Sequence, residues 1–197
     1  MTSSQQLDDA VALLAAGGVA AVATDTVFGL VCDPCNADAV EQVYALKNRP
    51  EGLELTLLLA RATDATDLVS WTPEANRLAE HLWPGPLSVV LPVGTRRLVI
   101  PRRGETLSLR VPDHPTLRRL LRETGPLAST SANRHGTAPA TSADSVREQF
   151  GDEVPVVLDG GHASGVASTI IDCSVTPPRV LREGPIPSHT LAAVIRG

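Results

Sequence analysis

The sequence predicts a single-domain α/β fold with a mixed β-sheet and flanking helices. Helical and extended patterns alternate along all 197 residues, without an internal repeat, low-complexity tract or linker. Residues 87–111 hold several strand candidates joined only by turns, so the sheet should be mixed and not purely parallel. A hydrophobic content of 43% is enough for one sizeable core. We expect one domain over residues 1–197 and no C-terminal extension domain.

The N-terminal part predicts two helices and two strands. Apolar residues at helical spacing predict an opening helix that a glycine pair, residues 17–18, can end. The apolar residues 19–23 predict a buried strand that delivers Thr24 to its carboxyl end. Asn36 can cap a second helix, and a strand over residues 55–60 follows.

The middle of the chain predicts one helix and a group of strands. A Thr-Pro pair at residues 72–73 can open the helix, and the sequence Trp-Pro-Gly-Pro at residues 83–86 breaks it. A strand over residues 87–91 comes next. Residues 98–100 and 107–111 are further strand candidates because both are apolar or alternate with period two.

The C-terminal part continues the alternation. Asp113 can cap a helix that runs through Leu121, after which residues 126–129 should extend into a loop over residues 131–133. The remaining expected elements are a helix over residues 142–150, strands over residues 154–158 and 168–172, and a helix that begins at Ser188. In open sheets of this class, ligands bind beyond the carboxyl ends of strands. Thr24, residues 129–133 and residues 160–161 all fall at such ends.

Composition and missing motifs exclude several function classes. The net charge is −5 and the pI about 5.5, so no global basic field exists to hold nucleic acid. The chain contains no Walker A segment, no G-x-G-x-x-G after a strand and no G-x-S-x-G nucleophile elbow. P-loop, Rossmann and Ser-His-Asp hydrolase functions are therefore disfavoured.

Cysteine usage indicates a reduced cytoplasmic protein. The three cysteines are an odd number, and neither a signal peptide nor an apolar stretch long enough for a bilayer is present. Cys32 and Cys35 have the spacing of a zinc knuckle or redox pair, but no second ligand pair follows at a usable distance. We interpret them as packing thiols and expect no metal site built by the protein.

Two groups of cations are candidates for binding phosphate or carboxylate. Lys47 and Arg49 stand at the exit of the second helix, where they could hold phosphate charge or form an ordinary solvated pair that complements the helix dipole. Arg110 should lie on the strand face opposite its apolar neighbours, beside Thr106 and Ser108, either in a site or at a sheet edge that meets water. Arg182 is open to the same two interpretations.

Three short segments occur together in this chain: TDTVFGL at residues 24–30, KNRP at residues 47–50 and STSAN at residues 129–133. The small hydroxyls of the last segment are typical of turns, yet they would also let backbone N–H groups surround a phosphate. Together the segments resemble the YrdC-type L-threonylcarbamoyladenylate synthases. The resemblance spans about residues 17–186 and includes the segments L-R-V-P-D-H-P and R-x-L-R-x-G.

This resemblance implies a twisted α/β fold around a mixed β-sheet with a large, positively lined substrate cleft. In that cleft L-threonine, bicarbonate and ATP would give threonylcarbamoyl-AMP and pyrophosphate. Mg²⁺ would accompany ATP. Transferase proteins acting downstream would move the threonylcarbamoyl group to the adenosine beside the anticodon of certain tRNAs, any contact of this chain with tRNA would be weak, and no membrane is involved.

The resemblance also implies the site residues. Lys47 and Arg49 would be catalytic. The ATP-binding residues would be Lys47, Arg49, Thr106, Ser131, Asn133 and Arg182. The L-threonine-binding residues would be Thr24, Arg110, Ser129 and Ser168.

Two alternatives are kept. Relatives typically have lysine or asparagine followed by proline and leucine where this chain has Leu53, Glu54 and Leu55. A polar cleft residue would then be missing and an acid added, as in a paralogue that forms a carbamoyl-adenylate. The second alternative is an RNA-binding or ribosome-maturation factor fed by arginine pairs at residues 96–97, 102–103 and 118–119, which the 3% aromatic content and the acidic total disfavour.

Overall fold

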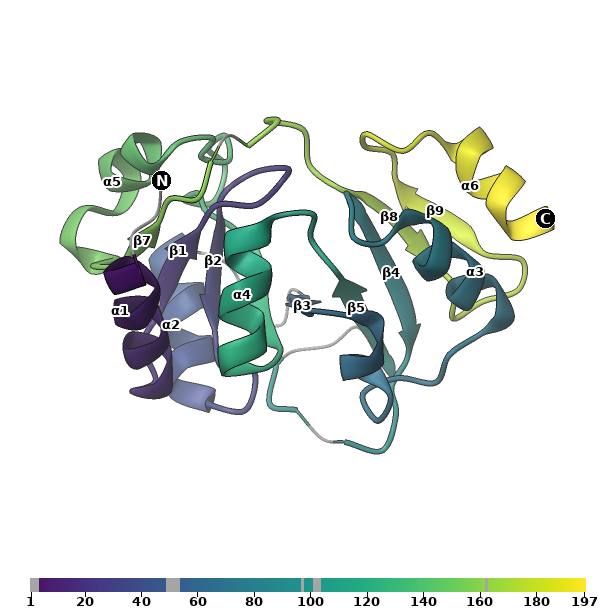
Figure 1. Ribbon diagram of the computed structural model, residues 1–197, viewed down its shortest axis with the longest axis horizontal. Coiled ribbons are helices and arrows are strands. Elements are labelled where there is room, and N and C mark those ends of the chain that lie inside the picture. Colours follow the sequence, from purple (N-terminus) through teal and green to yellow (C-terminus); the bar gives the residue numbers. More distant parts are fainter. Residues whose placement is uncertain (1–3, 49–53, 97, 101–103, 162) are drawn as a thin grey trace.

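The computed structural model describes residues 4–48, 54–96, 98–100, 104–161 and 163–197. Strands of the described chain form one nine-stranded sheet in the order β7-β1-β2-β6-β3-β5-β4-β8-β9, with the chain termini toward opposite ends of the long axis (Figure 1). The strands are β1 (Ala20–Val22), β2 (Gly29–Cys32), β3 (Thr56–Leu58), β4 (Leu87–Pro92), β5 (Thr106–Arg110), β6 (Leu127–Ser131), β7 (Val157–Leu158), β8 (Thr169–Asp172) and β9 (Arg179–Arg182). The helices are α1 (Ser4–Ala15), α2 (Ala37–Lys47), α3 (Pro73–Leu82), α4 (Pro115–Thr124), α5 (Ala143–Phe150) and α6 (Ser188–Arg196), with short 3-10 turns η1 (Ala62–Ala65) and η2 (Gly151–Glu153).

The sheet is mixed, as predicted. β1 pairs with β7, β3 with β5 and β4 with β8 in parallel, whereas the other neighbours pair antiparallel. Several strands that follow each other in the sequence are not neighbours in the sheet, and the central strands β6, β3 and β5 come from three separate parts of the chain.

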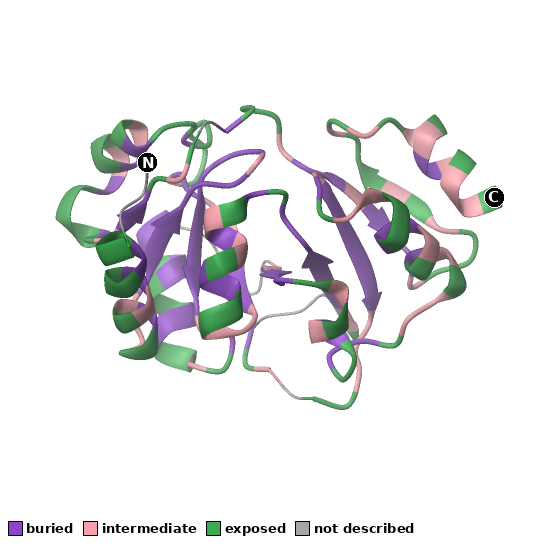
Figure 2. Cartoon of the chain, in the orientation of Figure 1, coloured by how far each residue is buried: buried purple, intermediate pink, exposed green. Residues whose placement is uncertain are grey.

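Helices cover the two faces of the sheet unequally. α1 and α4 contribute leucines to one apolar cluster with Val22 and Val31, whereas α2 and α5 pack with Ala21 and Leu30 in the other cluster. α3 and α6 contact each other and cover the far end of the sheet around β4 and β8 (Figure 1). Figure 2 shows the resulting pattern of buried strands between helices whose outer faces are exposed.

Most helix starts predicted from the sequence are confirmed. The side chains of Asn36, Thr72 and Ser142 accept hydrogen bonds from backbone N–H groups three residues later, at 3.1, 3.2 and 3.1 Å. Each satisfies a donor that the first helical turn leaves without a partner. The predicted cap at Asp113 is wrong, because Pro115 is the first residue of α4 and the capping position is therefore His114. Nδ1 of His114 accepts from Leu117 N at 3.2 Å.

The strand predictions need three corrections. Residues 98–100 do not form a strand: Val99 N instead donates to Pro34 O at 3.1 Å and Ile100 is buried in the core. β2 and β9 were not predicted. β2 begins within the last two residues of the TDTVFGL segment and continues past it, and β9 is a mostly exposed edge strand with an arginine at each end. The strand expected over residues 154–158 is reduced to β7, which covers only its last two residues.

His114 gives the fold a dependence on pH. Burial lowers the pKa of His114 below its ordinary value of 6.5. The opposing contributions, which raise the pKa, come from Asp25, the Gly160 backbone, Asp113 and Asp159, and they are smaller. The packing is close, since a Cβ at Gly160 would lie 2.5 Å from Cε1 of His114. The folded protein therefore binds the His114 proton less readily than the unfolded chain does.

We predict that stability declines as the pH falls below 6.5 and that His114→Asn removes a part of this decline. Because its folded pKa is lowered, the stabilisation from His114 is fully present above its ordinary pKa and is lost at lower pH. Asparagine keeps the helix cap but does not titrate. Urea unfolding of both proteins across this pH range measures the difference, and identical pH dependence in the two would contradict the prediction.

Candidate active site

A row of small hydroxyls crosses the three central strands on one face of the sheet. Ser129 on β6 pairs with Thr56 on β3, and Thr56 pairs with Ser108 on β5. The hydroxyl oxygens of Thr56 and Ser108 are 3.0 Å apart. The alternate residues Leu57 and Leu109 point to the opposite face, where both are fully buried. One face of these strands thus builds core while the other forms a polar floor.

This polar floor lies in a cavity of about 770 Å³. The volume falls within the usual range for small-molecule sites. The predicted site residues that line the cavity are Thr24, Lys47, Arg110, Ser129, Ser131, Asn133, Ser168 and Arg182. Thr106 does not line it, because it stands at the start of β5 and only the later positions of that strand reach the cavity. Arg49 lies outside the described residues.

Lys47 is the only lysine of the chain, and it is buried, with 3% of its surface exposed. Its ammonium donates to the backbone oxygens of Ser131 and Asn133 and to Oδ1 of Asn133, the latter two at 2.9 Å. The solvated-pair interpretation is therefore wrong for Lys47. A compact ammonium with three donors suits these three acceptors, and the planar guanidinium of arginine would not.

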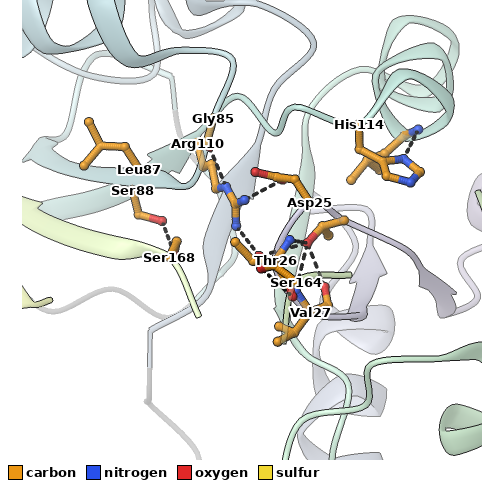
Figure 3. A network of polar contacts seen from close by, with 12 residues as sticks. Asp25, Thr26, Val27, Gly85, Leu87, Ser88, Arg110, His114, Ser164 and Ser168 are labelled. Atoms are coloured by element: carbon orange, nitrogen blue, oxygen red, sulfur yellow. Dashed lines mark hydrogen bonds and ion pairs between the residues drawn. The ribbon is translucent and has the colours of Figure 1, made fainter. Parts of the chain in front are cut away.

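Arg110 lies on a central strand, between β3 and β4, so the interpretation as a sheet-edge residue is wrong. The residue is 5% exposed. Its guanidinium donates to Asp25 Oδ1 at 2.5 Å, to Thr26 Oγ1 at 2.8 Å and to the Gly85 carbonyl at 3.0 Å (Figure 3). Burial lowers the pKa of Arg110, and the charge and hydrogen bond of Asp25 oppose this effect.

The turn after β1 presents Asp25 and Thr26 to Arg110. The Thr24 hydroxyl accepts hydrogen bonds from Thr26 N at 3.0 Å and Val27 N at 3.2 Å, and it donates one to the Val27 carbonyl at 2.7 Å. The Thr24 side chain therefore stabilises this turn by hydrogen bonds to the backbone of the turn. The sequence analysis did not single out Asp25 or Thr26. The available signal was an acid two residues after the apolar run 19–23.

Arg182 and Ser168 line the cavity on the same side as Arg110. The guanidinium of Arg182 donates to the Ser168 carbonyl at 2.9 Å and to its hydroxyl at 3.2 Å. Figure 3 shows that this hydroxyl also faces Ser88 Oγ, and the two oxygens are 3.1 Å apart. Burial is the main factor that lowers the pKa of Arg182, and the positive charge of Arg110 lowers it further. Two guanidinium groups near one cavity favour a bound anion such as a carboxylate or a phosphate.

Several lining residues were missed by the sequence analysis. Thr56 and Ser88 belong to strands whose register only the folded sheet reveals, and His135 follows the STSAN segment at the rim. Glu54 also lines the cavity, so the acid noted in the sequence does reach it. Leu53 lies outside the described residues. Gly29 leaves room above the hydroxyl floor because it has no side chain: a Cβ at this position would lie 2.9 Å from Ser129 Oγ.

Other candidate sites find less support in the described part of the chain. Within it, no group of three or more His, Cys, Asp or Glu side chains could hold a metal ion. Of the arginines proposed for RNA contact, Arg118 donates to the Ala60 carbonyl and Arg119 pairs with Glu123 on the same helix. The helices in the described ranges are all too short or too polar to cross a bilayer.

Comparison with known proteins identifies similar chains. The model of the Sua5/YciO/YrdC family, described as telomere recombination, matches residues 12–184. The threonylcarbamoyl-AMP synthase of Bacillus subtilis is 36% identical over 98% of this chain, which spans 58% of that protein. A putative threonylcarbamoyl-AMP synthase of Mycobacterium tuberculosis is also 36% identical, again over 98% of this chain but with 90% of the relative covered.

Solved structures agree with these sequences. Sua5 of Pyrococcus abyssi in complex with L-threonine matches with a TM-score of 0.90 and 32% identity, over 98% of this chain and 58% of that one. YciO of Escherichia coli matches with a TM-score of 0.85 and 25% identity, over 96% and 94% of the two chains. These matches cover the nine-stranded sheet and the helices around it.

We predict that Asp25→Ala lowers the free energy of unfolding by roughly 3 kcal/mol, the lower end for breaking a buried ion pair, because Arg110 also borders the cavity. The matched control is Glu123→Ala, which removes the partner of Arg119 from an exposed pair and should cost less than about 1 kcal/mol. Urea unfolding at neutral pH measures both. Equal, small losses would show that Asp25 does not stabilise a buried charge.

Proposed function

The chain belongs to the Sua5/YciO/YrdC family, and we propose that it is a nucleotidyltransferase that makes L-threonylcarbamoyl-AMP and pyrophosphate from L-threonine, bicarbonate and ATP. The observation that carries this proposal is that cationic side chains border one cavity from two sides. Arg110 and Arg182 stand at one wall, and Lys47 with the 131–133 loop stands at the other side of the hydroxyl floor. Such a cavity suits two anionic substrates that must meet.

Arg110 is the proposed partner of the threonine carboxylate. Three of its N–H donors are used by the protein, and a guanidinium has five, so two remain for a ligand. Ser129 and Ser168 supply short hydroxyls for the threonine side chain and amine. Thr24 would act by shaping the turn that carries Asp25, because its hydroxyl is already shared with the backbone of that turn. The P. abyssi structure with threonine supports an amino-acid site in this fold.

The 131–133 loop is the proposed seat of the ATP phosphates, with Ser131, Asn133 and Arg182 as partners. Lys47 would act there through its positive charge, because its three N–H donors meet protein oxygens. Arg49 stays a predicted partner. No role for Thr106 is proposed, since it lies outside the lining. Glu54 is the one carboxylate among the described lining residues, so the cavity does not fit a Mg²⁺ ion held by the protein alone. Mg²⁺ would enter as part of the ATP substrate.

The reaction requires the threonine amine to take up bicarbonate with loss of water, which gives a carbamate. A carbamate oxygen then attacks the α-phosphorus of ATP, and the bond to the leaving pyrophosphate breaks. Negative charge spreads over the phosphate oxygens during this step. Lys47 and Arg182 are fixed by protein contacts before the reaction and would stabilise that charge without reorganising. Binding both substrates in one cavity supplies the orientation.

The product would be used by a transferase that modifies the adenosine beside the anticodon of tRNA. We propose a cytoplasmic location, supported by the cysteines Cys32, Cys35 and Cys173, none of which forms a disulfide.

We predict that the protein releases pyrophosphate from ATP only when both threonine and bicarbonate are present, without added RNA. Because a site built around a hydroxyl rejects analogues that lack it, 2-aminobutyrate should be used about 100-fold less efficiently or worse. Turnover of carbamoyl phosphate in place of threonine and bicarbonate would instead support the carbamoyl-adenylate alternative. No dependence on either small substrate would refute the proposed function.

We also predict that Lys47→Ala and Lys47→Arg both lower adenylate formation by roughly 10- to 1,000-fold, the range for losing one preorganised electrostatic contact. The arginine variant keeps the charge but cannot reproduce three compact hydrogen bonds. Single-turnover assays with saturating ATP measure the loss. Near-normal rates in the arginine variant would show that charge alone, and not the geometry of the ammonium, matters.

A further inference from the structure

Arg134 directly follows the 131–133 loop, but its side chain does not line the cavity. Its guanidinium donates to the Leu46 carbonyl at 2.7 Å and to the Gln149 carbonyl at 3.2 Å, and it pairs with the carboxylate of Glu153. It also lies over the Phe150 ring, with 5.2 Å between its central carbon and the ring centroid. One side chain thus joins α2, α5 and η2 behind the loop.

The contacts of this guanidinium are matched to its charge. Leu46 and Gln149 each belong to the last turn of a helix, where unpaired carbonyls and the helix dipole favour a cation. An exposed ion pair with Glu153 alone would contribute little. The two carbonyls and the aromatic ring make the arrangement specific for a forked, planar cation.

Backbone contacts connect Arg134 to the groups that face the cavity. The N–H of the next residue, His135, donates to the Lys47 carbonyl at 2.6 Å. Nδ2 of Asn133 donates to the Arg134 carbonyl at 2.9 Å and to the Thr137 carbonyl at 2.8 Å. These bonds fix the amide so that its Oδ1 faces Lys47 Nζ and the Ser131 hydroxyl, at 2.9 and 2.6 Å.

We propose that Arg134 is a positioning residue that sets the geometry of Lys47 and Asn133 from behind the loop. It clamps the end of α2, which carries Lys47, to the segment that carries Asn133. Its effect on catalysis rests on the proposed function, whereas its effect on Lys47 does not.

The first test compares Arg134→Ala and Arg134→Gln with Arg147→Ala. Arg147 is a control arginine on the exposed face of α5, where its guanidinium donates to Asp144. Misplacing the loop should raise the Michaelis constant for ATP or lower kcat by about 10- to 100-fold in the Arg134 variants. The dissociation constant for threonine, measured by calorimetry, should stay unchanged. A merely structural role would reduce the active fraction, and the Michaelis constant for ATP and the kcat per active site would then keep their wild-type values.

The second test uses the single lysine and needs no turnover. Trace acetic anhydride modifies amines, so acetylation of Lys47 can be measured by mass spectrometry relative to the N-terminal amine. Releasing the loop should raise Lys47 reactivity several-fold in Arg134→Ala and Arg134→Gln, whereas Arg147→Ala should match the wild type. ATP should protect Lys47 less in the Arg134 variants.

Wild-type Lys47 reactivity in both folded Arg134 variants would overturn the proposal. If the wild-type protein released no pyrophosphate, the proposed function would fail, and the reactivity of Lys47 would still decide the role of Arg134. Circular dichroism and urea unfolding identify a variant that does not fold, and the milder Arg134→Gln then carries the comparison.

Discussion

A guanidinium buried in the middle of the sheet is the constraint on which the site depends. An isolated charge at that depth would cost several kcal/mol, and the chain meets this cost with partners from two other segments. Asp25 and Thr26 come from the turn after β1, and the Gly85 carbonyl comes from the turn before β4. Satisfying Arg110 therefore draws two distant turns to the same end of β5. The turns that supply hydrogen-bond partners to the Arg110 guanidinium thus form this wall of the cavity.

The same logic operates at the other side of the hydroxyl floor. Lys47 is buried at the end of α2, and the backbone and amide oxygens of the 131–133 loop surround its ammonium. Both cations are held by protein oxygens before any ligand arrives, which is what an electrostatically preorganised site requires. Between these two cations, the short hydroxyl side chains of Ser129, Thr56 and Ser108 form the polar floor of the cavity. Helices cover the remaining parts of the sheet, so the cavity stays where the sheet face is polar.

Local signals explain what the sequence could predict. The cap at Asn36 and the helix starts at Thr72 and Ser142 are confirmed, because a capping side chain acts on the backbone only three residues away. Thr24 follows β1 as predicted, whereas residues 129–131 belong to β6 itself and only residues 132–133 lie beyond its end. The hydroxyl row escaped prediction because Thr56 and Ser108 are 52 residues apart and become neighbours only through parallel pairing of β3 and β5. Edge or centre is likewise a property of the whole sheet, so the buried state of Arg110 could not be derived from its own strand.

The most direct measurement is a crystal structure of the protein with L-threonine and a non-hydrolysable ATP analogue. We expect the threonine carboxylate within hydrogen-bonding distance of the Arg110 guanidinium, with the Asp25 pair intact. The phosphates of the analogue should lie against the 131–133 loop, near Lys47. Threonine bound away from Arg110, or a nucleotide bound outside the cavity that Lys47 and Arg110 share, would contradict the assignment of this cavity as the site where the two substrates meet.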